Sequence, residues 1–401
     1  MDSTWTSPPT FPQTRRSDLT APGTADRSSP ESQAIHTVVI YFSRLGAPMY
    51  THEKVTLSIV AENIALLNGW RHAGAFDPAE RSGGSLFFVP DDTLMLNEAQ
   101  DLGIHCPHQL YGAVAPYPFV KTKAITHGLV SAHAARPYGW SSAFAGSMQN
   151  AVLPGYTVFS ADDARMAAMR LFSLGPIRVK EPLGDGGHGQ TVVAGISELD
   201  ALLETLSPEH IASHGLVLET HLRGVTTRSV GQTTIGNRMI TYHGTQRAVT
   251  NNHGLSVYGG SHLVCVRGGW AELEDLPMDA ETRLAVSQAR TYDHNADRYP
   301  GFLASRRNYD VGRGIDGRGQ WRSGVFEASW RSGGASTAEL AALMAFTQDT
   351  SLQVVEATSV KQFGRRTKIP ASAVVHFHGD DPQDGPLLRY TVVTRAMPRA
   401  A

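Results

Sequence analysis

One segment of the sequence places a lysine next to a run of glycines. Residues 178–190 read RVKEPLGDGGHGQ, and an apolar run follows them. Glycine loops expose backbone N–H groups and a neighbouring lysine adds a positive charge, so this combination suits a polyphosphate. The segment therefore predicts a phosphate site made by Lys180, Gly186, Gly187 and Gly189. An ordinary glycine-rich turn is the alternative, because glycine is the default turn residue.

Two better-known phosphate motifs do not explain this segment. Its glycines match the letters of G-x-G-x-x-G, but a dinucleotide fingerprint needs a helix after the loop, and the residues that follow favour a strand. A Walker loop needs Gly-Lys-Ser/Thr after its glycines, which this segment lacks. The remaining interpretation is a two-stranded hairpin, with Lys180 on the first strand, whose glycine loop closes over a nucleoside triphosphate.

A second segment predicts a hairpin that carries acidic residues. Residues 308–331 contain two apolar stretches around a glycine-rich connection. If the turn is centred near Arg318 and Gly319, Asp310 lies opposite Glu327 on the neighbouring strand. Opposed residues point to the same face of a sheet, so the two carboxylates would share a surface.

The alternation of side chains along a strand adds Ser329 and Arg331 to that surface. Opposed carboxylates repel each other, and a divalent cation such as Mg²⁺ relieves the repulsion while binding substrate phosphates. The alternative is a surface hairpin in which Arg313 and Arg331 only screen the acids. A register slip of one residue would also separate the group.

Together the two segments resemble the ATP-grasp superfamily. Its members carry a lysine before a glycine-rich flap, and later an acidic residue followed by a Glu-x-Asn pair that binds Mg²⁺. The resemblance implies that Asp310, Glu327 and Ser329 hold Mg²⁺ and that Lys180 and Arg331 are catalytic. The chain departs from the pattern at Ser329, where serine replaces asparagine and offers a shorter, weaker ligand.

Further positions match in the expected order. Within residues 122–127, TKAITH, the resemblance makes Lys123 the ligand of the α-phosphate. Within residues 215–222, GLVLETHL, it places Glu219 and Leu222 beside the adenine. The acidic residue that usually follows and holds the ribose is missing. The resemblance covers about residues 119–345. It is closest to an uncharacterised proteobacterial branch that is distantly biotin-carboxylase-like, although no residue indicates biotin chemistry.

The implied fold is α/β and α+β. It combines an N-terminal parallel α/β lobe, a small flap subdomain and a mixed or antiparallel C-terminal core sheet. The predicted organisation is a disordered tail at 1–34, the lobe at 35–120, the first ATP-grasp part at 121–222 with the flap at about 156–218, the core at 223–360 and a C-terminal hairpin at 361–401.

Apolar periodicity predicts several individual elements. The expected strands are 37–42, 86–90 and a C-terminal pair near 371–378 and 388–393. The expected helices are 53–70, 161–174 with Ser160 as its cap, 198–206 with Ser197 as its cap, and 337–346. A polar, glycine-rich stretch at 250–260 is either a substrate loop or an exposed connector, and the nearby Arg228 and Arg247 either bind a substrate carboxylate or are only solvated.

The resemblance implies a ligase that depends on ATP and Mg²⁺. A carboxylate would attack the γ-phosphorus to form an acyl phosphate, and an amine or thiol would then displace phosphate. One alternative is a nucleotide-binding regulatory or degenerate ATP-grasp protein without turnover, which the serine at position 329 and the missing ribose acid favour. Another is a scaffold in which the glycine loops are only turns.

Composition sets the remaining expectations. The 401 residues include 41% hydrophobic and 18% charged residues, with a formal net charge of -2. This charge does not predict binding to nucleic acid. No apolar run is long enough to span a membrane, and the N-terminal residues lack a signal-peptide pattern. The two cysteines fit a reducing cytoplasm better than a disulfide framework. The sequence does not fix the oligomeric state, and a homodimer is the commonest soluble assembly.

Overall fold

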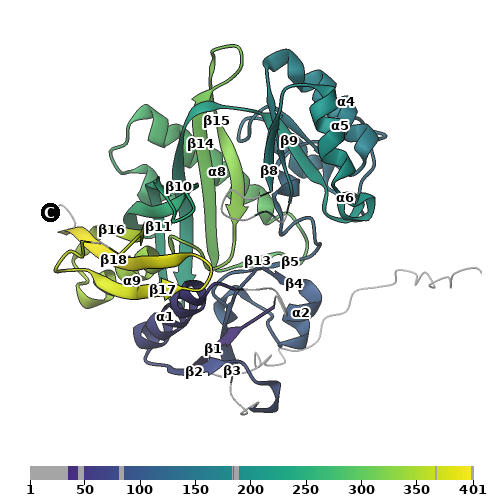
Figure 1. Ribbon diagram of the computed structural model, residues 1–401. Coiled ribbons are helices and arrows are strands. Elements are labelled where there is room, and N and C mark those ends of the chain that lie inside the picture. The colour runs from purple at the N-terminus through teal and green to yellow at the C-terminus, as the bar shows by residue number, and fades with distance from the viewer. Residues whose placement is uncertain are drawn as a thin grey trace, which may run out of the picture. The chain divides into compact units, whose positions relative to one another are not determined.

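The computed structural model describes residues 35–43, 49–80, 85–182, 184, 189–365 and 368–398 (Figure 1). The tail predicted at residues 1–34 lies outside these residues, and so do Gly186 and Gly187 of the predicted phosphate loop. Residues 35–401 cluster as one unit. The domain boundaries predicted inside that unit remain predictions.

The first described elements form a small parallel sheet covered by a helix. The strand order is β2-β1-β3, and β1 is parallel to both neighbours. The bounds are β1 Ile35–Tyr41, α1 Thr51–Asn68, β2 Arg71–Ala75, the 3₁₀ turn η1 Pro78–Glu80 and β3 Ser85–Pro90. The predicted parallel lobe is confirmed. Strand β2 was not predicted because its sequence, RHAGA, has neither a β-branched nor an aromatic side chain other than histidine.

Short elements connect this lobe to the rest of the chain. Their bounds are β4 Leu94–Met95, α2 Leu96–Asp101, η2 Pro107–Gln109, β5 Ala113–Ala115, η3 Lys123–Thr126 and α3 Ser142–Ser147. Strand β5 pairs with β4 and with the distant β13, Leu303–Ala304. The segment that carries Lys123 is a 3₁₀ turn in the structure, and the Thr122 side chain caps it by accepting a hydrogen bond from the N–H of Ala124.

The predicted flap is a four-stranded antiparallel sheet with helices packed on it, in the order β6-β9-β7-β8 within the described residues. The bounds are β6 Gly155–Val158, α4 Ala161–Leu171, η4 Phe172–Leu174, β7 Ile177–Lys180, β8 Gln190–Val193, α5 Ile196–Glu204, α6 Pro208–His214 and β9 Leu216–Thr220. Ser160 caps α4 as predicted. The prediction for Ser197 is wrong, because α5 already begins at Ile196, where the Glu198 carboxylate accepts a hydrogen bond from the N–H of Ala194.

The core is a larger sheet in which all strand pairs among the described residues are antiparallel. Its order is β15-β14-β10-β11-β12-β16-β18-β17. The bounds are β10 Arg223–Ile235, β11 Arg238–Thr250, β12 Ser256–Arg267, α7 Trp270–Glu274, α8 Ala280–Ala296, β14 Arg306–Ile315, β15 Trp321–Ser329, α9 Ser336–Gln348, β16 Leu352–Phe363, β17 Val374–Asp381 and β18 Gly385–Pro398. The predicted C-terminal hairpin is present as β17 and β18, and it extends the core sheet at one edge (Figure 1).

The polar stretch predicted at 250–260 is mostly strand. Strand β11 runs to Thr250 and β12 starts at Ser256, so only the turn between them is irregular. The turn packs against the β17–β18 turn, where the Asn252 side chain donates hydrogen bonds to the carbonyls of Asp384 and Pro386.

Helices cover the two faces of the core sheet because side chains alternate along each strand. Tyr309 on β14 packs in one hydrophobic cluster with Tyr292 of α8. Tyr242 on β11 packs on the other face, in a cluster shared with α1 and α9. Arg306, Asn308 and Asp310 alternate with Tyr309 and therefore share the α9 face. None of the described helices is long and apolar enough to cross a membrane.

Candidate active site

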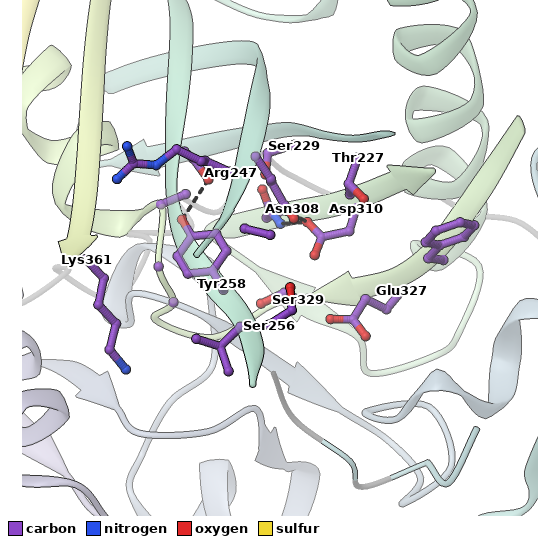
Figure 2. Close-up of a pocket in the computed structure, with 18 of the residues that line it drawn as sticks. Thr227, Ser229, Arg247, Ser256, Tyr258, Asn308, Asp310, Glu327, Ser329 and Lys361 are labelled. Atoms are coloured by element: carbon purple, nitrogen blue, oxygen red, sulfur yellow. Dashed lines mark hydrogen bonds between the residues drawn. The ribbon is translucent and has the colours of Figure 1, made fainter. Parts of the chain in front are cut away.

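A cavity of about 1050 Å³ opens between the flap strands and the α9 face of the core sheet. Its lining includes nine of the residues singled out in the sequence: Lys180, Glu219, Leu222, Arg228, Arg247, Asp310, Glu327, Ser329 and Arg331. Figure 2 shows several further residues that point into it from different strands of the core sheet. The cavity therefore collects polar side chains that lie more than a hundred residues apart in the sequence.

The register of the acidic hairpin agrees with the sequence prediction. Asp310 on β14 is paired directly with Glu327 on β15, and Asn308 with Ser329. The register shifts by one residue at Phe326, between the pairs that contain Asp310 and Val311, so a β-bulge lies beside the acids. Figure 2 shows the carboxyl groups of Asp310 and Glu327 pointing into the same space, with the Ser329 hydroxyl nearby.

Burial and the neighbouring Glu327 charge raise the pKa of Asp310 from 3.8 to about 6. Two amide groups oppose this rise by donating hydrogen bonds to Asp310 Oδ1, from Gln246 Nε2 at 2.7 Å and from Asn308 Nδ2 at 3.0 Å. The carboxyl group is thus held in place, and its charged form is less favourable than that of an ordinary aspartate.

The raised pKa of Asp310 makes the free energy of unfolding depend on pH. Because the folded chain holds the Asp310 proton more tightly than the unfolded chain, its contribution to stability falls as the pH rises from 3.8 through about 6. Across that window, in metal-free buffer, the free energy of unfolding of the wild type should fall relative to that of Asp310→Asn by about 1–3 kcal/mol. Denaturant titrations at several pH values measure the difference, and parallel stability curves for the two proteins would contradict it.

Lys123 lies beside the acidic hairpin. Its ammonium group is 2.9 Å from Glu327 Oε2 and also donates a hydrogen bond to the carbonyl of Gly184. Gly184 belongs to the glycine-rich loop, so Lys123 joins this loop to the core sheet. The structure brings Lys123 next to a predicted Mg²⁺ ligand, and its role as an α-phosphate ligand remains a prediction.

Lys180 is buried and paired with Glu219. Its Nζ is 2.6 Å from Glu219 Oε1, donates a hydrogen bond to the carbonyl of Phe326 at 3.0 Å, and lies 4.8 Å from the centre of the Phe326 ring. Phe326 is the bulge residue of β15. The lysine of the flap therefore contacts the core hairpin at the position where its register shifts.

Glu219 keeps one oxygen without a hydrogen bond. Burial raises its pKa, while the Lys180 charge lowers it. Oε2 is buried and has no hydrogen-bond partner among the described residues. The nearest nitrogen of His127, Nε2, is 3.8 Å away and also lies 3.0 Å from the Leu153 carbonyl. Burial and the Lys180 charge lower the pKa of His127 to about 3, so its ring is neutral at pH 7. One carboxylate oxygen of this cavity-lining residue is therefore left without a hydrogen-bond donor among the described residues.

The remaining predicted residues lie around this centre. Leu222 is buried and lines the cavity next to Glu219. Arg331 also lines it, with Nε 3.6 Å from Asp92 Oδ1. Gly189 has φ +66° in the left-handed region, and its carbonyl accepts the N–H of Glu181, which closes the base of the predicted glycine hairpin. Arg228 and Arg247 line the cavity too, and Arg228 lies within 4 Å of Asp279 and Glu281.

Comparison with known proteins gives a family and a fold. A family model described as "Protein of unknown function (DUF3182)" matches residues 41–391. The chain belongs to the DUF3182 family. No curated protein is similar to it in sequence.

Solved structures are similar to this DUF3182 chain over most of its length. The biotin carboxylase domain of 2-oxoglutarate carboxylase from Hydrogenobacter thermophilus, crystallised with MgADP, ADP and bicarbonate, has a TM-score of 0.50 and 10% identity over 90% of this chain and 87% of that one. N5-carboxyaminoimidazole synthetase from Staphylococcus aureus, complexed with ADP, has a TM-score of 0.47 and 14% identity over 91% of this chain and 95% of that one. The DUF3182 chain has the ATP-grasp fold, as the sequence predicted.

Sequence reasoning missed a buried ion pair beneath the site of this DUF3182 chain. Arg306 contacts Glu339 of α9 through two bonds, Nη2 to Oε1 at 2.7 Å and Nε to Oε2 at 3.0 Å, and both side chains are fully buried. Arg306 Nη1 also donates hydrogen bonds to the carbonyls of Ser329, at 3.1 Å, and Arg331. The pair therefore anchors the end of β15. One signal was present in the sequence, because Glu339 is the single charged residue of the helix 336–348.

Proposed function

We propose that this protein binds ATP with Mg²⁺ in the cavity and uses it to join a carboxylic acid to an amine or a thiol. The observation that carries the proposal is the pair of opposed carboxylates, Asp310 and Glu327, in the same cavity as the buried Lys180. The fold is shared with a domain crystallised with MgADP, which supports a nucleotide in this position.

The donor set fits a magnesium ion that also binds phosphates. No group of three or more His, Cys, Asp and Glu side chains suited to a metal occurs within the described part of the chain. Mg²⁺ commonly takes only one or two carboxylates and completes its shell with waters and substrate phosphates. Asp310 and Glu327 would supply the carboxylates and Ser329 a neutral oxygen. Burial and repulsion between the two neighbouring carboxylates raise the pKa of Asp310, and a bound cation would relieve the repulsion.

The buried lysine and its partner fit the other parts of the nucleotide. Glu219 Oε2 lacks a hydrogen-bond donor, and the amino group of adenine is a donor of the right kind. Leu222 lies beside it and offers an apolar surface for a base. Lys180 would donate a charged hydrogen bond to a phosphate oxygen in place of the Phe326 carbonyl. Lys123 would likewise donate to a phosphate oxygen in place of the Gly184 carbonyl of the glycine loop.

The chemistry would follow from positioning and charge. ATP bound with Mg²⁺ supplies the phosphoryl group that activates a carboxylate as an acyl phosphate. Lys123 and Lys180 would hold phosphate oxygens, and Arg331 would stabilise negative charge on the transferring group. The flap hairpin, joined to the core through Lys180 and Lys123, would exclude water from the reactive intermediate.

A screen for phosphate release tests this proposal. Purified protein with Mg²⁺ and ATP would be incubated with pairs of carboxylic acids and amines or thiols, and released phosphate would be measured. We expect release that needs both an acid and an acceptor, with a product whose mass equals their sum minus water. Phosphate release that needs no acid would contradict carboxylate activation.

A nucleotide-binding protein without turnover is the second candidate, and one observation favours it. Ser329 occupies the place of the asparagine in the ATP-grasp pattern and also pairs across the sheet with Asn308. Restoring the amide with Ser329→Asn separates the two candidates. If the protein lacks turnover, the wild type would bind nucleotide without releasing phosphate. Ser329→Asn would then gain phosphate release.

A further inference from the structure

Arg389 lines one end of the cavity, and no sequence motif predicted a binding residue there. It is on β18, paired in register with Lys361 on β16, and both residues line the cavity. Ser359 and Thr391 lie two pairs further along and so lie on the same face of the sheet, and the Thr391 hydroxyl donates a hydrogen bond to the Thr337 hydroxyl of α9. Arg389 therefore shares the α9 face of the sheet with Asp310.

The guanidinium group of Arg389 has no hydrogen-bond or ion-pair partner among the described residues. Other half-buried or buried arginines of this chain are paired, such as Arg306 with Glu339 and Arg307 with Asp293 and Asp297. Burial lowers the pKa of Arg389, whereas nearby carboxylates raise the pKa of Arg306 and Arg307. A desolvated charge without a partner is costly, so its presence in a cavity wall calls for a ligand of opposite charge.

The charges around Arg389 indicate which anionic group would suit this end of the cavity. Lys361 is already paired with Asp384 at 2.8 Å. Asp381 is held by the ring of His52 at 3.0 Å and by backbone N–H groups. Glu53 on α1 is an exposed acid that also lines the cavity. One unpaired cation among these acids suits a singly charged carboxylate better than a doubly charged phosphate.

Tyr258 connects the two ends of the cavity. Burial is the main cause of the raised pKa of its hydroxyl. The Asp310 carboxylate adds to this rise and the Arg389 guanidinium opposes it, so both charges lie near Tyr258. Figure 2 shows its ring between Lys361 on one side and Asp310 with Ser329 on the other. Five strand spacings separate β14 from β18, about 24 Å along a flat sheet. A group bound to Arg389 therefore lies toward the opposite end of the cavity from Asp310 and Glu327.

We propose that Arg389 binds a carboxylate of a substrate that reacts elsewhere in the cavity, so that one substrate carries an acidic group that takes no part in the reaction. Its use in catalysis rests on the proposed function, but binding at Arg389 does not. The substrate class is an elongated molecule with a terminal carboxylate, such as a dicarboxylic acid or an amino-acid derivative. A bidentate guanidinium–carboxylate contact would fix its orientation.

Selective chemical modification tests the subsite without knowledge of the natural ligand. Phenylglyoxal reacts with accessible arginines, and peptide mass spectrometry reports the rate at Arg389 with glutarate, inorganic phosphate or chloride at equal ionic strength. We expect saturating glutarate to slow modification of Arg389 at least about tenfold, as a charged hydrogen-bond pair would. Modification of Arg283, exposed on α8 outside the cavity lining, should not change. An unreactive Arg389, equal rates in glutarate and chloride, or protection by phosphate alone would overturn the proposal.

The variant Arg389→Gln separates a binding role from a structural one. Because no described residue pairs with this guanidinium, we expect the ligand-free variant to melt no lower than the wild type and to lose the glutarate-dependent rise in melting temperature. A clear fall in the melting temperature would assign Arg389 to the fold and contradict the proposal. Binding of a non-hydrolysable ATP analogue to the wild type is measured separately. Its absence, together with protection of Arg389, would reject the ligase and leave the carboxylate site standing.

Discussion

Replacing Glu339 by glutamine should lower the free energy of unfolding by about 3–5 kcal/mol, because it removes one partner of a buried ion pair. Three hydroxyl groups donate to this carboxylate in addition to Arg306, from Tyr111 at 2.8 Å, Thr233 at 2.7 Å and Tyr242 at 2.8 Å. Glutamine has one acceptor oxygen in place of two, so it leaves Arg306 charged and leaves donors unpaired. Denaturant unfolding of the two proteins measures the loss.

Glu356→Gln is the matched control for this substitution. Glu356 is a half-exposed acid on β16. Its nearest basic groups, His262 and Arg395, are 3.6 and 3.7 Å away. Its loss should cost no more than about 1 kcal/mol. A cost for Glu339→Gln that is no larger than that of the control would contradict a structural role for the pair. If the protein does not fold at all, Arg306→Met combined with Glu339→Leu is compared instead. It removes both charges together and should recover the part of the loss that comes from the unpaired Arg306 charge.

Glu327→Gln should reduce turnover by about 100- to 1000-fold, the typical cost of removing one preorganised group that stabilises charge in a transition state. The substitution removes a carboxylate that faces Asp310 and also the partner of Lys123. Since side-chain volume is kept and Glu327 is half-exposed, the fold should persist. Phosphate release with the acid and acceptor found by screening measures the loss, and a binding titration with the ATP analogue separates affinity from rate.

Glu274→Gln serves as the control for turnover. Glu274 is a half-exposed acid on α7, paired with Arg290 and absent from the cavity lining. The control should keep wild-type rates. Turnover of Glu327→Gln within a fewfold of the control would contradict the assignment of this carboxylate to Mg²⁺.

The acidic hairpin was predictable because local signals determine it. Glycines mark its turn, and alternation then assigns the faces of both strands. The hairpin nevertheless contains a β-bulge that the sequence does not reveal. The pairs near the turn, such as Ile315 with Trp321, are centred on Arg318, and the bulge at Phe326 shifts the register so that Asp310 meets Glu327. A regular hairpin with this turn would have paired Asp310 with Phe326.

The partners of the cationic residues were not predictable, because they depend on contacts distant in sequence. Lys180 and Glu219 meet because β7 pairs with β9. Lys123 meets Glu327 from a segment some two hundred residues away. For the same reason nothing in the sequence set Arg389 apart from other arginines. Its environment is formed by α1 and by strands that join the sheet only through long-range pairing.

The Lys180–Glu219 pair also decides which variant can test the nucleotide site. Lys180→Ala alone would leave the buried Glu219 charge without its cation, so a loss of binding would be mixed with a loss of stability. The double variant Lys180→Met with Glu219→Gln removes both charges and keeps similar volumes. It should remain folded while losing the lysine that we assign to phosphate and the acceptor that we assign to adenine.

The most direct test of the nucleotide site is the melting temperature with Mg²⁺ alone and with Mg²⁺ plus a non-hydrolysable ATP analogue. At 100 times the dissociation constant the analogue should stabilise the folded wild type by about 2.7 kcal/mol, and the melting temperature should rise with analogue concentration. The same titration of Lys180→Met with Glu219→Gln should give no rise. An unchanged melting temperature of the wild type at saturating analogue, or an equal rise in the double variant, would contradict ATP binding in this cavity.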